Sequence, residues 1–310
     1  MSADGVPPVP SSVSPPAQRY LAQSRSAPAV YPAADDHAGW RRHAAEVDAY
    51  LLSLYADRDL PVTSEVADAG GVRTYVQRPA EADADGPVYL DIHGGGLVYG
   101  SGDVCRTAGA ATATATGLVT WSVDYRMPPR HPAPAPLDDC LAVYRALLEV
   151  RVPTQIVVGG GSAGGNLAAA LLVRARDEGL PLPAALVLLT PEVDLTESGD
   201  SFVTHRDVDT RLHSLREINA IYADGADLAH PYLSPLFADL AGFPPTFLQS
   251  GTRDLFLSNT VRMHRALRAA GVPAELHVFE AMPHGGFGGS TPEDRELERE
   301  LRRFVRAHVG

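Results

Sequence analysis

Short apolar runs alternate with segments of helical spacing from about residue 72 onward. Several runs, such as QIVV and LVLL, are apolar throughout, which is typical of strands with both faces buried. The predicted strands are Val72–Arg78, Val88–Ile92, Leu118–Tyr125, Gln155–Val158, Ala185–Thr190, Thr246–Ser250 and Ala274–Phe279. The predicted helices are Leu137–Glu149, Ala163–Asp177, Ser258–Ala270 and Pro292–Ala307. This alternation predicts an α/β fold with a mostly parallel sheet and helices on both faces.

Two segments depart from the alternation, and we expect both to form a cap over one end of the sheet. Residues 195–232 are polar and helix-like, and residues 19–66 carry large apolar side chains at helical spacing, namely Trp40, Val47, Tyr50, Leu51, Leu54 and Tyr55. The predicted organisation is an N-terminal tail and helical cap segment at 1–66 and a main domain at 67–310, with 195–232 as the second cap segment. The Pro- and Ser-rich start of the chain is expected to be a disordered or loosely draped tail.

The composition of the chain excludes several kinds of partner and reaction. The formal net charge of −12 disfavours nucleic acid or an anionic membrane as a partner. All 26 basic residues are Arg, and the absence of Lys excludes Schiff bases and P-loop chemistry. Cys105 and Cys140 lack the spacing of metal ligands, so we expect two buried apolar residues and no metal site. With no secretory pattern and no membrane-spanning apolar run, a cytoplasmic protein is expected.

The stretch GGGSAGGN at residues 159–166 lies between a predicted strand and a predicted helix. It contains G-x-S-x-G centred on Ser162, the pattern of a nucleophile elbow, in which a sharp turn lifts the serine hydroxyl above the sheet. Gly159, Gly161 and Gly164 also satisfy G-x-G-x-x-G, which leaves dinucleotide binding open. That alternative is weaker because the motif follows at least three strands instead of opening the sheet.

Three further features follow other strand ends. The tetrapeptide HGGG at residues 93–96 leaves backbone N–H groups uncovered, which suits an oxyanion hole. Asp254 and His284 each come after a later strand. The order Ser162, Asp254, His284 is that of α/β-hydrolases, and this combination favours a nucleophilic triad over isolated capping or surface residues.

With these motifs, the chain resembles the hormone-sensitive-lipase family of bacterial esterases, which have the α/β-hydrolase fold. The resemblance extends from about Tyr89 to the C-terminal helix and includes HGGG, GGSAGG, MPHGGF and DYRMPPRHPAPAPLDD at 124–139. It implies Ser162 as nucleophile, His284 as general base and Asp254 as the group that orients the base. It also implies a helical cap, no cofactor, and oxyanion N–H groups from Gly94, Gly95 and Ala163.

The chain departs from the family pattern at three positions. Gly161 precedes the nucleophile where the family usually has Asp, which predicts looser hydrogen bonding and slower catalysis. Arg130 stands where Glu is common, and Glu192 lies where an apolar or aromatic residue is expected. Glu192 and His93 are the candidates for substrate binding: Glu192 would compensate Arg130 or meet a cationic substrate group. A solvated or capping carboxylate is the simpler alternative.

The expected function is hydrolysis of small, short-acyl carboxylic esters by a serine hydrolase. A lactone hydrolase or a small-metabolite deacetylase would use the same triad. A non-catalytic small-molecule receptor and an NAD(P)-binding oxidoreductase remain alternatives from other classes. The last helix could pair with a second copy in a homodimer, although its charged face favours solvent.

Overall fold

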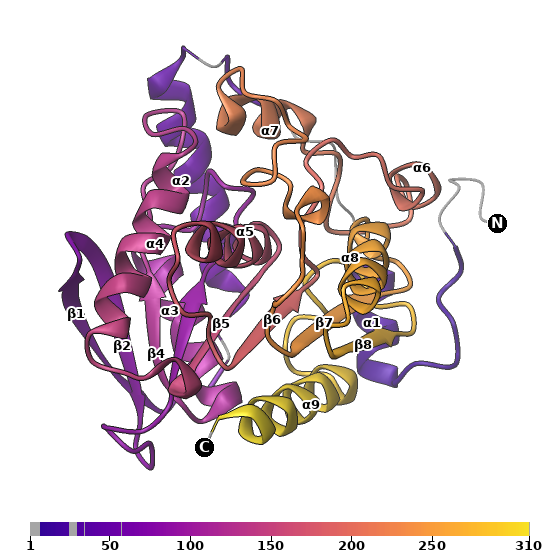
Figure 1. Ribbon diagram of the computed structural model, residues 1–310. Helices are drawn as coiled ribbons and strands as arrows, with labels where there is room; N and C mark the ends of the chain where they lie inside the picture. The colour runs from indigo at the N-terminus through magenta and orange to yellow at the C-terminus, as the bar shows by residue number, and fades with distance from the viewer. Residues whose placement is uncertain (1–6, 25–29, 34, 57, 310) are drawn as a thin grey trace.

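The structure is a computed structural model that describes residues 7–24, 30–33, 35–56 and 58–309. Its strands are β1 (Val62–Ala69), β2 (Val72–Pro79), β3 (Val88–Ile92), β4 (Val119–Val123), β5 (Ile156–Gly161), β6 (Ala185–Leu189), β7 (Thr246–Gly251) and β8 (Ala274–Phe279). They form one sheet in the order β1-β2-β4-β3-β5-β6-β7-β8 (Figure 1). The pairs β1–β2 and β2–β4 are antiparallel and the other pairs are parallel. The predicted α/β class with a mostly parallel sheet is confirmed.

Helices cover both faces of this sheet. On one face, α4 (Ala135–Leu148), α5 (Ala163–Asp177) and α8 (Leu257–Ala269) share an apolar cluster with Leu90 and Ile92 of β3. On the other face, Tyr89 packs with Leu301 and Phe304 of α9 (Pro292–His308), and α3 (Asp103–Thr116) contacts α9. Because successive strand residues point to opposite faces, Tyr89 and Asp91 share the face that carries α3 and α9.

Besides helix α1 (Pro15–Gln23), described below, two elements were not predicted because neither has a clear apolar pattern. The edge strand β1 reads VTSEVADA, is mostly exposed and pairs with β2 alone. The predicted boundary at residue 66 therefore falls inside a strand of the sheet. Helix α3 consists largely of Ala and Thr, and the sequence revealed only its end, where Gly117 has a left-handed φ of 76°.

The prediction of a loosely draped tail is wrong for the described part of the N-terminus; its first six residues lie outside the described range. Helix α1 (Pro15–Gln23) begins at Ser14, whose hydroxyl accepts from the N–H of Ala17. Ala17 and Leu21 are buried in a cluster with Met282. Pro and Ser suit a helix start as well as a disordered segment, and this apolar pair supplies the tertiary contact that orders it.

The predicted cap segments contain α2 (His37–Ser53), α6 (Ser201–Thr204) and α7 (Arg216–Ala223). Trp40 and Leu51 of α2 pack in one cluster with Leu215 and Ile218, so the two segments touch at one end of the molecule (Figure 1). Short 3₁₀ turns occur at Pro153–Gln155 and Pro235–Phe237. Within the described ranges, no helix combines the length and apolarity needed to cross a membrane.

Candidate active site

Ser162 occupies the sharp turn between β5 and α5. Its φ is +55° and its ψ is −122°, a conformation that is costly for a residue with a side chain. The turn packs tightly against the neighbouring strand: a Cβ on Gly164 would overlap the carbonyl oxygen of Ile92. The glycine pattern at 159–166 is therefore explained by close backbone packing around a half-buried serine, as predicted for a nucleophile elbow.

His284 and Asp254 complete a hydrogen-bonded chain to Ser162. The Nε2 atom of His284 lies 3.0 Å from Ser162 Oγ, and its Nδ1 atom lies 3.0 Å from Asp254 Oδ1. Asp254 is fully buried, and its carboxylate also accepts from Ser250 Oγ at 2.6 Å and from the Phe256 N–H at 2.9 Å. These donors fix the carboxylate, so Asp254 can hold the imidazole with Nδ1 protonated and Nε2 free to accept the serine proton.

A second carboxylate, Asp209, was missed by the sequence analysis. It is buried in the second cap segment, and its Oδ2 accepts from the backbone N–H groups of Leu255 at 2.8 Å and His284 at 3.3 Å. Burial raises the pKa of Asp209, and the nearby His284 lowers it. This side chain ties the cap segment to the loops that carry Asp254 and His284. Nothing in its polar loop sequence marked it out.

The HGGG loop lies beside the serine. A Cβ on Gly94 would come within 2.9 Å of the Gly161 carbonyl oxygen, so the two turns are in contact. The N–H groups of Gly94, Gly95 and Ala163 donate to none of the described residues. The loop is anchored from the cap, because Asp48 of α2 accepts from the Gly100 N–H at 2.9 Å. The structure thus brings the predicted oxyanion donors and the predicted triad together.

The two substrate-binding candidates have different positions. His93 lines the cavity described below, stacks on Tyr125 at 4.1 Å, and has its pKa lowered by burial. Glu192 is fully buried and lies outside that cavity lining; its Oε1 accepts from Asn219 Nδ2 at 2.9 Å. Arg130 is exposed, and no ion pair joins it to Glu192 in the described structure. The compensation hypothesis for Glu192 is therefore wrong, and so is the simpler expectation of a solvated carboxylate.

A cavity of about 550 Å³ opens over Ser162 and His284. Apolar side chains of α2, including Val47 and Leu51, cover it from the cap side. Below the serine it continues between the sheet, α3 and α9, where Asp91 and Thr112 line it. The candidate nucleophile therefore faces a space large enough for a small organic molecule.

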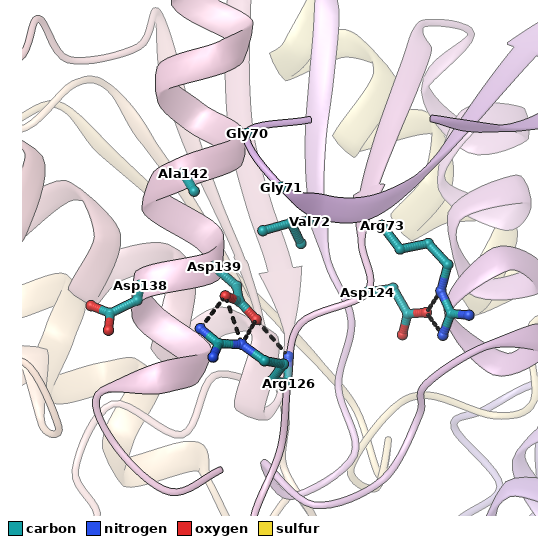
Figure 2. A pocket seen from close by; sticks show the side chains of 9 residues that line it. All are labelled: Gly70, Gly71, Val72, Arg73, Asp124, Arg126, Asp138, Asp139 and Ala142. Carbon is teal, nitrogen blue, oxygen red and sulfur yellow. Dashed lines mark hydrogen bonds and ion pairs between the residues drawn. The ribbon is translucent and has the colours of Figure 1, made fainter. Parts of the chain in front are cut away.

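A second pocket of about 600 Å³ lies away from the triad, beside β2 and α4 (Figure 2). Its two arginines are already paired: Arg73 with Asp124, and Arg126 with Asp139 through both carboxylate oxygens. A pocket with neutralised guanidinium groups and no nucleophile offers no comparable chemistry.

His93, Cys105 and Asp124 place one ligand-type atom each within 4.8 Å of one another. This cluster does not suit a metal ion. Asp124 already accepts from Arg73 and from Ser101, and burial raises the pKa of the Cys105 thiol well above its usual value. Cys105 and Cys140 are both buried and free, which confirms the prediction of buried apolar residues.

Comparison with known proteins settles the family. A sequence profile described as the alpha/beta hydrolase fold matches residues 89–287. The chain belongs to this family. As an α/β hydrolase it is 34% identical to an acetyl-hydrolase from Streptomyces hygroscopicus over 75% of this chain and 79% of that protein. It is 32% identical to an esterase from Acinetobacter venetianus over 69% of this chain and 73% of that protein.

Solved structures show which group of α/β hydrolases this protein resembles. It superposes on esterase E25 with a TM-score of 0.89 and 34% identity, covering 98% of this chain and 97% of the other. An esterase of the bacterial hormone-sensitive lipase family matches with a TM-score of 0.84 and 34% identity, covering 96% and 99%. The protein is a hormone-sensitive-lipase-like esterase of the serine hydrolase class, as the sequence motifs predicted.

Proposed function

We propose that this protein hydrolyses small carboxylic esters, with Ser162 as nucleophile, His284 as general base and Asp254 as the residue that orients the base. The observation that carries the proposal is the continuous chain from Ser162 Oγ through both nitrogens of His284 to Asp254, with two contacts of 3.0 Å. Each contact has the length of a hydrogen bond that can transfer or hold a proton.

In the proposed reaction, Ser162 Oγ attacks the ester carbonyl carbon while His284 Nε2 takes the hydroxyl proton. The carbonyl oxygen becomes an oxyanion, which the N–H groups of Gly94, Gly95 and Ala163 would stabilise. Each such donor contributes about 10²–10³ in rate. When the bond to the alcohol oxygen breaks, His284 returns the proton to that oxygen. Water then hydrolyses the acyl-enzyme by the same route.

Small esters with short acyl groups fit the site best. The cavity volume of about 550 Å³ is shared between the cap side and the space below Ser162, so neither part is large. The relative named acetyl-hydrolase supports this size class. A lactone or an acetylated metabolite would use the same atoms, because each presents an ester or acyl carbonyl to the same nucleophile.

The alternatives from other classes have less support. A non-catalytic receptor would not need the strained backbone of Ser162 or the aligned His284 and Asp254. Dinucleotide binding would use the glycine turn at 159–164 as a phosphate loop, yet that turn is packed against the Ile92 carbonyl and carries the serine at its tip.

Labelling with a fluorophosphonate probe tests the proposal without a choice of substrate. Intact mass should show one adduct on the wild type and none on Ser162→Ala. Ser53→Ala is the matched control, because Ser53 is an exposed serine on α2 outside the cavity, and it should label like the wild type. A folded wild-type protein without an adduct, or a labelled Ser162→Ala variant, would overturn the assignment.

A further inference from the structure

The cavity below Ser162 has an arm that the proposed reaction does not use. We call it the distal arm and define it by Tyr89, Asp91, Ala111, Thr112, Ala115 and Leu301. Three of these residues lie on one face of α3 at spacings of three and four, where alanine side chains leave space. Leu301 of α9 closes the opposite wall. The arm is continuous with the space around the nucleophile.

Tyr89 places a hydroxyl without a partner in this arm. Its side chain is only 1% exposed, and its hydroxyl makes no hydrogen bond to any residue in the described ranges. The hydroxyl lies against β5, since a Cβ on Gly159 would overlap it. Gly159 precedes Ser162 by three residues, which corresponds to roughly 10 Å along a strand. The hydroxyl is open to the cavity, so a bound chain that excludes water from it must replace the lost hydrogen bond.

Asp91 lies two residues further along β3 on the same face, and two hydroxyl groups donate to its carboxyl group. Gln77 donates from Nε2 to the Arg106 carbonyl at 3.1 Å, so its Oε1 faces Ser122 Oγ at 3.2 Å. Ser122 Oγ also donates to Asp91 Oδ2 at 3.1 Å, so its one proton is shared between the two acceptors.

Asp91 gives the end of the arm a hydrogen-bond acceptor. Thr112 Oγ1 donates to Asp91 Oδ1 at 3.0 Å, which leaves one lone pair of that oxygen for another donor. Burial raises the pKa of Asp91 to about 6. A hydroxyl group could accept from Tyr89 and donate to Asp91, whereas an ammonium group could not accept from Tyr89.

We infer that the distal arm takes the acyl chain of the ester and that Tyr89 and Asp91 bind a hydroxyl group near the far end of that chain. The inference rests on the proposed esterase function and names a substrate class for it. A short plain acyl chain ends before the polar groups. A longer plain chain reaches them and leaves the Tyr89 hydroxyl unpaired, so it is disfavoured, and a terminal hydroxyl restores the pairing.

The test compares p-nitrophenyl esters in matched pairs from acetyl to decanoyl, each pair ending in a methyl or a hydroxyl group. The readout is the ratio of kcat/KM values, hydroxyl over methyl, which does not depend on the fraction of active enzyme. In the wild type this ratio should rise to about tenfold at one medium chain length. Tyr89→Phe removes only the hydroxyl and should bring the ratio close to one at that length. Tyr232→Phe is the matched control, since that hydroxyl bonds Asp177 outside the cavity, and it should keep the wild-type ratio.

Several results would overturn the inference. A ratio close to one at every length in the wild type would do so, as would an unchanged ratio in Tyr89→Phe. Preference for a terminal amine over a hydroxyl would contradict the proposed pairing, because an ammonium group cannot accept from Tyr89. A hydroxyl preference seen only on the alcohol side of the ester would assign the arm to the alcohol. Failure of the esterase proposal itself is distinguishable from all of these results. In that case p-nitrophenyl acetate is not hydrolysed and the fluorophosphonate leaves no adduct.

Discussion

Glu192 should make the stability of this protein fall steeply as the pH rises towards 8. The carboxyl is fully buried next to the nucleophile turn: its own backbone N–H donates to the Ser162 carbonyl at 3.2 Å. Burial raises its pKa from 4.5 to about 8. Its Oε2 atom has no partner within the described structure, and the Oδ1 atoms of Asn166 and Asn219 also lack a donor. A protonated carboxyl suits this environment better than a carboxylate.

The magnitude follows from the shift. The native state holds the Glu192 proton up to about pH 8, whereas the unfolded chain releases it near pH 4.5. The contribution is therefore complete below pH 4.5 and is lost as the pH rises through this window. At about 1.4 kcal/mol per pH unit, the loss amounts to about 5 kcal/mol in the free energy of unfolding. Glu192→Gln keeps the shape and the acceptor for Asn219 but cannot ionise, so it should lack this loss.

Urea denaturation at a series of pH values from 5 to 9 tests this reasoning. The variant Glu192→Gln should become more stable than the wild type as the pH rises, with the difference growing by roughly 1.4 kcal/mol per unit. The exposed Glu149→Gln variant is the control for loss of a surface charge and should follow the wild type. Parallel profiles for the wild type and Glu192→Gln would refute the reasoning, because they would mean that Glu192 does not change its protonation on folding.

Three further predictions concern the residues around the triad. Asp254→Asn should lower kcat by about 10³–10⁴ in a folded protein, because an amide favours the wrong imidazole tautomer; an esterase assay with a circular dichroism control checks this. Asp209→Asn should lower kcat more than it raises KM, since an amide cannot accept from all four backbone N–H groups that bind the carboxylate, those of Arg211, Leu212, Leu255 and His284. Equal changes in both would contradict a positioning role. Asp48→Ala should slow the fluorophosphonate reaction about tenfold, because it leaves the Gly100 N–H without its acceptor. Asp48→Asn should retain much of the rate, because its amide oxygen still accepts. Equal rates for the two variants would rule out a role for this hydrogen bond.

The sequence predicted those parts of the fold and site that depend on local patterns. Continuous apolar runs marked β5 and β6, and the glycines around Ser162 marked the turn that their backbone packing requires. Motif order brought Asp254 and His284 into the same site before any distance was known. These signals are short in sequence and specific in chemistry.

The features that the sequence did not predict depend on contacts between distant segments. Asp209 meets the His284 backbone across 75 residues, and Asp48 meets Gly100 across 52, so neither bond leaves a mark in the local sequence. Glu192 was misread because a carboxylate after a strand usually faces solvent, whereas here α5 and α7 bury it. The edge strand β1 needs no apolar face, because backbone pairing with β2 along its whole length stabilises it.

The N-terminal helix has a practical consequence for anyone who shortens this protein. Its Ala17 and Leu21 pack beneath Phe287, and Ser14 binds the Glu293 carboxylate through both its N–H and its hydroxyl. Arg253, the residue before Asp254, donates to the Pro8 carbonyl at 2.6 Å. The composition of this N-terminal stretch would suggest removing it, yet it supports the loops that carry Asp254 and His284. A purification tag is therefore better placed at the C-terminus. Proteolytic cleavage before α2 should disturb the loops that position Asp254 and His284 against the nucleophile.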